Sequence, residues 1–176
     1  MERPEQSQES RIASPLGLAA EVERLMKMPQ HLCKQRGICC RVATFKGSLS
    51  HDEILALAAN PEAEGNEVAR DFASIFEPYP SQAHVREIAD EFVDRVRHVA
   101  AGKGQDPDKI SFFQCKYVLA DGRCGVHEDR PFGCRMYPFL HKNTIFHPGC
   151  GFEQQGKANW TRIEQILDQL GISSEF

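Results

Sequence analysis

The sequence has no long hydrophobic run, and this absence argues against a membrane-spanning helix. Such a helix needs about 20 consecutive, mostly apolar residues, and no stretch of the 176-residue chain approaches that length. The first ten residues, MERPEQSQES, also lack the apolar segment of a secretory signal peptide. We therefore expect a cytoplasmic protein that does not associate with membranes.

Basic charge and the common catalytic motifs are scarce as well. Lys and Arg number 21 against 25 Asp and Glu, a net charge of -4, so no nucleic-acid partner is expected. The chain has no Gly-rich phosphate loop, no nucleophile elbow and no His-Glu-x-x-His motif. Enzymatic activity is therefore left open, with no substrate visible.

Cysteine, in contrast, is abundant. Disulfides are disfavoured because no export signal is found, the number is odd, and Cys39 and Cys40 are adjacent, which strains a bridge between them. Inert buried thiols would not gather in two groups as these do. No Cys-x-x-Cys pair of a zinc finger or ferredoxin occurs. We interpret the cysteines as metal ligands: Cys33, Cys39, Cys40, Cys115, Cys124, Cys134 and Cys150.

The remaining pattern predicts a mainly α fold with a small irregular β-hairpin, in which helices surround a cysteine-rich metal-binding centre. Residues 1–13 look like a disordered tail, and residues 14–176 like one domain with a helical insert at about 50–101. Helix starts are expected at Ser14-Pro15, at the Ser50/Glu53 capping box and at Ser81, and a helix stop at Gly171. Strand-like pieces cover 42–45, 112–119, 124–127 and 144–146, and a short helix 131–136.

The predicted hairpin constrains two of the cysteines. A two-residue turn at Asp121-Gly122 would place Leu119 opposite Cys124. Cys115 would then lie four residues further along, roughly 13 Å away, which is too far for both thiolates to bind one ion. Either the loop is irregular or the two cysteines do not share an ion, and we favour an irregular loop.

The cysteine segments resemble the YkgJ family, cysteine-cluster proteins described as zinc- or iron-chelating. CKQRGICC matches the first family element through Cys33, Gly37, Cys39 and Cys40, and CGVHEDRPFGCR matches the second through Cys124, His127, Glu128, Arg130, Pro131, Cys134 and Arg135. Cys115 and Cys150 match the separate cysteines. Arg36 stands where the family has its second cysteine, so His31, His127 or His147 is a candidate to complete a ligand set.

The resemblance implies a metal-binding protein that carries an iron–sulfur cluster and has a redox or accessory role. The alternative is a structural zinc module that mediates a protein–protein interaction. All seven cysteines are candidate ligands, and Arg130 and Arg135 are candidate neighbours of the cofactor because a tetrathiolate site is anionic. A protein partner is expected in either case.

Overall fold

The computed structural model describes residues 14–45, 49–135 and 137–173, which form two compact units. Unit 1 comprises residues Met1–Lys34 and Pro131–Phe176, and unit 2 comprises Gln35–Arg130. Each unit is described by itself below. The predicted tail at 1–13 lies outside the described residues. The single domain over 14–176 stays a prediction, because two compact units can belong to one cooperatively folding domain.

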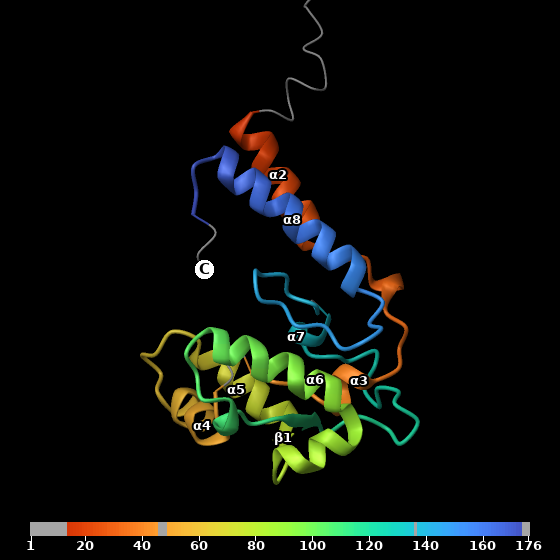
Figure 1. The fold of residues 1–176 in the computed structure, drawn as a ribbon. Coiled ribbons are helices and arrows are strands. Elements are labelled where there is room, and N and C mark those ends of the chain that lie inside the picture. The colour runs from red at the N-terminus through yellow and green to blue at the C-terminus, as the bar shows by residue number, and fades with distance from the viewer. Residues whose placement is uncertain (1–13, 46–48, 136, 174–176) are drawn as a thin grey trace, which may run out of the picture. The chain divides into compact units, whose positions relative to one another are not determined.

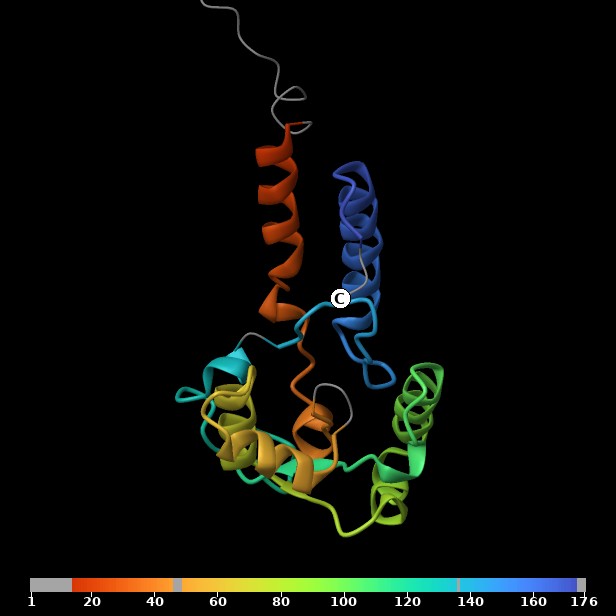
Figure 2. The ribbon, with the colours of Figure 1, turned by 90° about the vertical axis from the view of Figure 1, so that its left-hand side faces the viewer.

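Unit 1 is built on two long helices, α2 (Pro15–Met26) and α8 (Glu153–Gln169), which lie side by side (Figures 1 and 2). The Ser14 hydroxyl accepts a hydrogen bond from the Gly17 N–H, which confirms the predicted cap. The buried Asn159 side chain donates to the Leu25 carbonyl at 2.8 Å and so ties the two helices together. Their shared core consists of Leu18, Leu25, Ile163 and Ile166.

Two short helices complete unit 1. The 3-10 helix η1 (Gln30–Leu32) follows α2, and α7 (Phe132–Arg135) falls within the helix predicted over 131–136. The strand-like piece 144–146 forms no strand. Gly171 has φ of 68° directly after α8, as its predicted role as a helix stop requires.

Unit 2 contains the predicted helical insert. It has α4 (His51–Ala59), α5 (Asn66–Ile75) and α6 (Gln82–Gly102), followed by the 3-10 helix η3 (Pro107–Lys109) (Figure 1). Both hydrogen bonds of the Ser50/Glu53 capping box are present. Ser81 is the N-cap of α6, but its side chain makes no capping hydrogen bond. Among the described helices, none is long and apolar enough to cross a membrane.

The sheet of unit 2 differs from the predicted hairpin. Strand β2 (Phe113–Cys115) covers only part of the predicted 112–119, and it pairs with β1 (Phe76–Pro78) in an antiparallel register that sets Cys115 opposite Phe76. On its other side, Phe113 exchanges two backbone hydrogen bonds with Ala43, which is all that remains of the strand predicted over 42–45. The predicted mainly helical fold with a small β element is confirmed. Strand β1, the partner of β2, was not predicted.

The side chain of Phe113 lies in the core below this sheet. It packs with Phe45, Ile54 and Ala69, and its ring meets the edge of Phe72 at a centroid distance of 5.0 Å. Helices α4 and α5 therefore hold the strand that ends in Cys115, which links the helical insert to the cysteine segments.

Candidate metal centre

The turn between Cys115 and Cys124 contains three residues rather than two. The Gly122 N–H donates to the Leu119 carbonyl at 2.8 Å, and the Leu119 N–H donates to the Arg123 carbonyl at 2.9 Å. Gly122 has φ of 87°, as the third residue of a three-residue hairpin loop requires. The two-residue turn at Asp121-Gly122 was therefore wrong, and Cys124 lies opposite Val118 instead of Leu119.

The chain also reverses between Cys115 and Val118. The Val118 N–H donates to the Cys115 carbonyl at 3.3 Å, which closes a turn directly after β2. The separation of roughly 13 Å expected for an extended strand therefore does not apply. The irregular loop that we favoured is confirmed, and it lets the Cys115 thiol interact with the Cys124 thiol.

The first cysteine segment forms a single helical turn, α3 (Ile38–Arg41), that carries Cys39 and Cys40. Its N-cap, Gly37, has φ of 68° and lies directly against the backbone of Gly122. A Cβ added to Gly37 would come within 1.9 Å of the Gly122 carbonyl oxygen. A Cβ added to Gly122 would lie 2.7 Å from the Arg36 carbonyl oxygen. The loop before α3 and the hairpin turn therefore meet backbone to backbone, and neither position has room for a side chain.

Hydrogen bonds fix α3 further. The Arg41 guanidinium donates to the Ala120 carbonyl at 2.7 Å, and the Tyr79 hydroxyl donates to the Arg41 carbonyl at 2.7 Å. Shortly after α3, Ala43 joins Phe113 of β2. These contacts hold α3 against both the hairpin and the strand that leads to Cys115.

Cys39, Cys40, Cys115 and Cys124 form what we call the four-cysteine cluster. A hydrogen bond with the Cys39 thiol, burial and the neighbouring Cys39 charge all raise the pKa of Cys40, while the positive charge of Arg130 opposes them. Burial also raises the pKa of Cys115, and the Cys40 and Cys124 thiols add to that effect. The four side chains thus form a connected series of electrostatically interacting neighbours.

Groups that favour a thiolate lie beside the cluster. The Tyr117 N–H donates to Cys115 Sγ at 3.4 Å, and it lowers the pKa of that thiol against the effect of burial. Arg130, one of the two predicted cofactor neighbours, lowers the pKa of Cys40. Its Nε donates to the His127 carbonyl at 3.0 Å, which holds the side chain at the edge of the second cysteine segment.

The cluster is not preorganised for a metal ion. Within the residues that the structure describes, no three Cys, His, Asp or Glu side chains stand in an arrangement that could hold one. The donor set suits a thiophilic metal, since four thiols, an N–H donor and a cation are adjacent. A metal would require the cysteine side chains to rotate toward a common point, because two of them now hydrogen-bond to each other.

The other three cysteines belong to unit 1. Cys33 follows η1, Cys134 lies in α7 and Cys150 follows a turn that begins at the buried His147. The segments of Cys33 and Cys150 adjoin, since a Cβ at Gly151 would lie 1.8 Å from the Leu32 carbonyl oxygen. Of the remaining predicted residues, Arg135, His31 and His127 are exposed. Metal ligation by all seven cysteines stays a prediction.

The sequence reading missed the residues that assemble the cluster. Gly122 was read only as part of a turn, and Arg41 and Tyr79 were given no role. A usable signal was present, because Gly37 and Gly122 each stand two residues before a cluster cysteine, Cys39 and Cys124, and such a glycine permits close backbone approach.

Comparisons with known proteins give no relationship: no protein-family model matches the chain, and neither a curated protein nor a solved structure matches it.

Arg36, which stands three residues after Cys33 in the first cysteine segment, is exposed. We expect Arg36→Cys to leave the metal content and the visible spectrum of the purified protein unchanged, because the cluster already has the four thiolates that a four-coordinate site needs. Metal analysis of the variant beside Arg36→Ser, which removes the guanidinium without adding a thiol, checks this. More bound metal in Arg36→Cys alone would instead indicate an open coordination position that a thiol fills.

Proposed function

We propose that this protein binds a metal cofactor through the four-cysteine cluster, and that the cofactor is an iron–sulfur cluster with a redox or accessory role. The observation that carries the proposal is the contact between Gly37 and Gly122, which gathers cysteines from separate chain segments beside one another. The proposal also follows the resemblance of these cysteine segments to the YkgJ pattern, although no protein-family model matches the chain.

The chemistry of the cluster favours iron and sulfide. Four cysteine thiolates are the usual ligand set of [2Fe–2S] and [4Fe–4S] clusters, and N–H donors to the sulfurs and nearby charge tune their potentials. The Tyr117 N–H and Arg130 supply those two features here. The partly exposed Cys39, Cys40 and Cys124 would leave an edge of the cofactor accessible to a partner.

Zinc is the alternative occupant, because a four-thiolate zinc site uses the same donors. In that case the cofactor is structural, and the function is to present a surface to a protein partner. The cysteine spacing matches neither zinc fingers nor ferredoxins, so it does not separate the two metals. Zinc is the second choice because an N–H donor and a cation lie beside the thiols.

Purification without oxygen separates these possibilities. We expect a coloured protein that contains iron and acid-labile sulfide and absorbs broadly in the visible range, as iron–thiolate ligation does. A colourless protein with stoichiometric zinc would replace the iron–sulfur reading by the zinc module. A folded protein with neither metal would overturn the proposal.

Single Cys→Ser variants identify the ligands. We expect Cys115→Ser and Cys124→Ser each to remove most of the metal, because serine at neutral pH supplies no anionic sulfur. Variants at Cys33, Cys134 and Cys150 report whether unit 1 holds part of the metal, since any loss there is additional to that of unit 2. Full occupancy in both Cys115→Ser and Cys124→Ser would rule out the cluster as the site.

A further inference from the structure

In unit 1, the segment that follows η1 and the segment that precedes α8 run against each other. A Cβ added to Gly151 would lie 1.8 Å from the Leu32 carbonyl oxygen, so the two backbones touch at these positions. The Lys34 side chain extends along the second segment, and its ammonium donates to the Gly149 carbonyl at 3.4 Å. Residue numbers therefore rise along one segment as they fall along the other, and the two segments are antiparallel.

This register sets Cys33 opposite Cys150. Residues directly opposite each other in an antiparallel pair have Cα atoms about 4.5–5.5 Å apart, and a disulfide bridges Cα atoms about 4.4–6.8 Å apart. Both thiols are reduced in the structure, and Cys33 is exposed while Cys150 is half-buried. One thiol is thus open to a soluble oxidant, and the other stands where it can react next.

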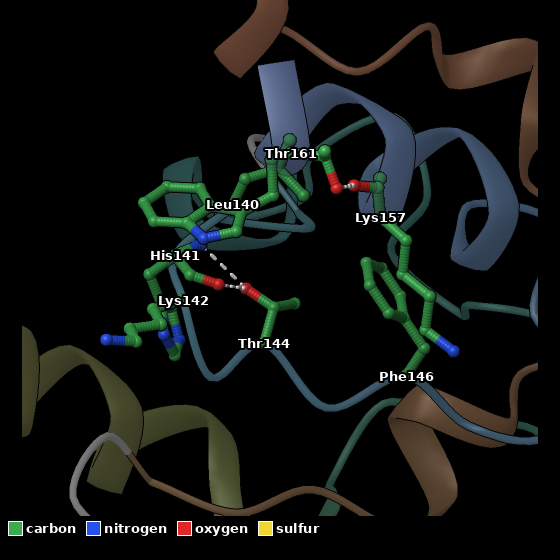
Figure 3. A pocket seen from close by; sticks show the side chains of 9 residues that line it. Leu140, His141, Lys142, Thr144, Phe146, Lys157 and Thr161 are labelled. Atoms are coloured by element: carbon green, nitrogen blue, oxygen red, sulfur yellow. Dashed lines mark hydrogen bonds between the residues drawn. The ribbon is translucent and has the colours of Figure 1, made fainter. Parts of the chain in front are cut away.

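A small core holds both segments in place. It consists of the buried side chains of Met28, Leu140, Phe146 and Phe152. Leu32 packs against this core from the first segment, and Cys150 from the second. Leu140 and Phe146 also line a pocket beside α8 (Figure 3). The Phe146 ring lies against Gly156, where a Cβ would come within 2.5 Å of Phe146 Cζ. Packing therefore fixes the chain around both cysteines.

A turn fixes the second cysteine further. The Cys150 N–H donates to the His147 carbonyl at 2.9 Å, and Gly149 between them has φ of 67°. Pro148 and Gly149 occupy the central positions, where a type II turn favours these two residues. The backbone at Cys150 is thus held from within its own segment as well as by the core.

We propose that Cys33 and Cys150 are an oxidation site, at which a small-molecule disulfide such as glutathione disulfide forms a reversible bridge. The Cys33 thiolate attacks one sulfur of glutathione disulfide, whose S–S bond breaks and releases one glutathione. The Cys150 thiolate then attacks the Cys33 sulfur of the mixed disulfide and releases the second glutathione. In sum, two protein thiols give up two electrons and two protons, and one glutathione disulfide becomes two glutathione thiols.

This pair is separate from the four-cysteine cluster and does not depend on the proposed cofactor. It also differs from the structural disulfides that the sequence disfavours. Disulfides of cytosolic proteins are mostly transient and often sense the redox state, and an exposed cysteine beside a resolving cysteine is the usual arrangement of such a sensor.

Trypsin digestion tests the bridge directly. Cleavage after lysine leaves Cys33 as the single cysteine of residues 28–34, and Cys150 as the single cysteine of residues 143–157. We expect the full-length protein, equilibrated with glutathione disulfide without oxygen and then alkylated, to give a peptide that joins these two segments. The melting temperature should rise by about 5–15 °C relative to Cys33→Ser treated in the same way, because the bridge restricts the unfolded chain.

Matched variants show whether the register makes the bridge. Cys150→Ser should lose both the joined peptide and the rise in melting temperature, whereas Cys134→Ser, which removes the third thiol of unit 1, should keep both. Gly151→Ala should lower the equilibrium constant for bridge formation by about tenfold, because its Cβ presses the segments apart. Gly133→Ala, where nothing lies within 4 Å of the new Cβ, should leave that constant unchanged.

Three results would each overturn the proposal: no peptide that joins residues 28–34 to 143–157, a bridge that requires Cys134, or a mixed disulfide with glutathione that persists at Cys33. Metal analysis covers the remaining possibility. Loss of metal in Cys33→Ser, together with protection of both thiols from glutathione disulfide in the unmodified protein, would identify the pair as metal ligands and overturn the proposal as well.

Discussion

Gly37→Ala is expected to lower the free energy of unfolding by about 2–5 kcal/mol and to abolish most metal binding. About 1–2 kcal/mol comes from placing an L-residue at positive φ, and about 1–3 kcal/mol from overpacking. The overpacking arises because the new Cβ would lie 1.9 Å from the Gly122 carbonyl oxygen. The hairpin must move away from α3, and the thiols of Cys39 and Cys40 then separate from those of Cys115 and Cys124. Urea denaturation and metal analysis measure both effects.

Gly65→Ala is the matched control. Gly65 is also a helix N-cap with positive φ, 86°, in the same unit, but nothing lies within 4 Å of a Cβ placed there. The variant should lose only the conformational part, about 1–2 kcal/mol, and should keep its metal. Equal metal content in the Gly37 and Gly65 variants would mean that the contact between Gly37 and Gly122 does not assemble the site.

Removal of the metal is expected to lower the melting temperature of the anaerobically purified protein by about 10–20 °C. In a thiolate site the free energy of metal binding is also folding free energy. For a chain of this size, a loss of about 5 kcal/mol corresponds to a shift of this order. The effect is large because the cofactor would cross-link α3, the end of β2 and the hairpin. Calorimetry before and after treatment with a strong chelator measures the shift.

The control for chelation is Cys124→Ser. This variant should already melt at the lower temperature, and chelator should change it little, because the site has lost a ligand. If the unmodified protein gives up its metal while its melting temperature stays constant, the site has no structural role.

The helices of this fold were predictable because their signals are local. Ser14-Pro15, the Ser50/Glu53 box and Gly171 each act within one helical turn, and all three mark a helix end in the structure. The sheet was not predictable in the same way. Strand β1 is three residues long and ends in Pro78, and it pairs with residues far along the chain, so no local pattern specifies it. The Asp-Gly dipeptide indicated a turn, but the loop length depends on which residue takes the positive φ.

The candidate site also has a part that local sequence specifies and a part that depends on contacts between distant segments. Cysteine positions and their two groups can be read from the sequence, and so can the proximity of Arg130 to a cluster cysteine. Which cysteines become neighbours depends on the packing of Gly37 against Gly122, a contact between distant segments that no spacing rule contains. Helix α6 also has a kink at Ala89, where φ is -151°. Ile88, which stands at helical spacing from the buried Val85 and Phe92, is exposed beside this kink.

In the sequence, the two long helices of unit 1 lie before and after unit 2. Because of this discontinuity, the residues of unit 2 are synthesised before unit 1 is complete. Every residue of unit 2 leaves the ribosome before α8 begins at Glu153. The cysteines of the four-cysteine cluster are therefore all available for cofactor loading while α2 still lacks its packing partner. The later hydrogen bond from Asn159 to Leu25 closes a long loop, whose entropic cost is smaller once the intervening unit is already compact. The cysteines of unit 2 can thus come together before the other half of the protein is complete.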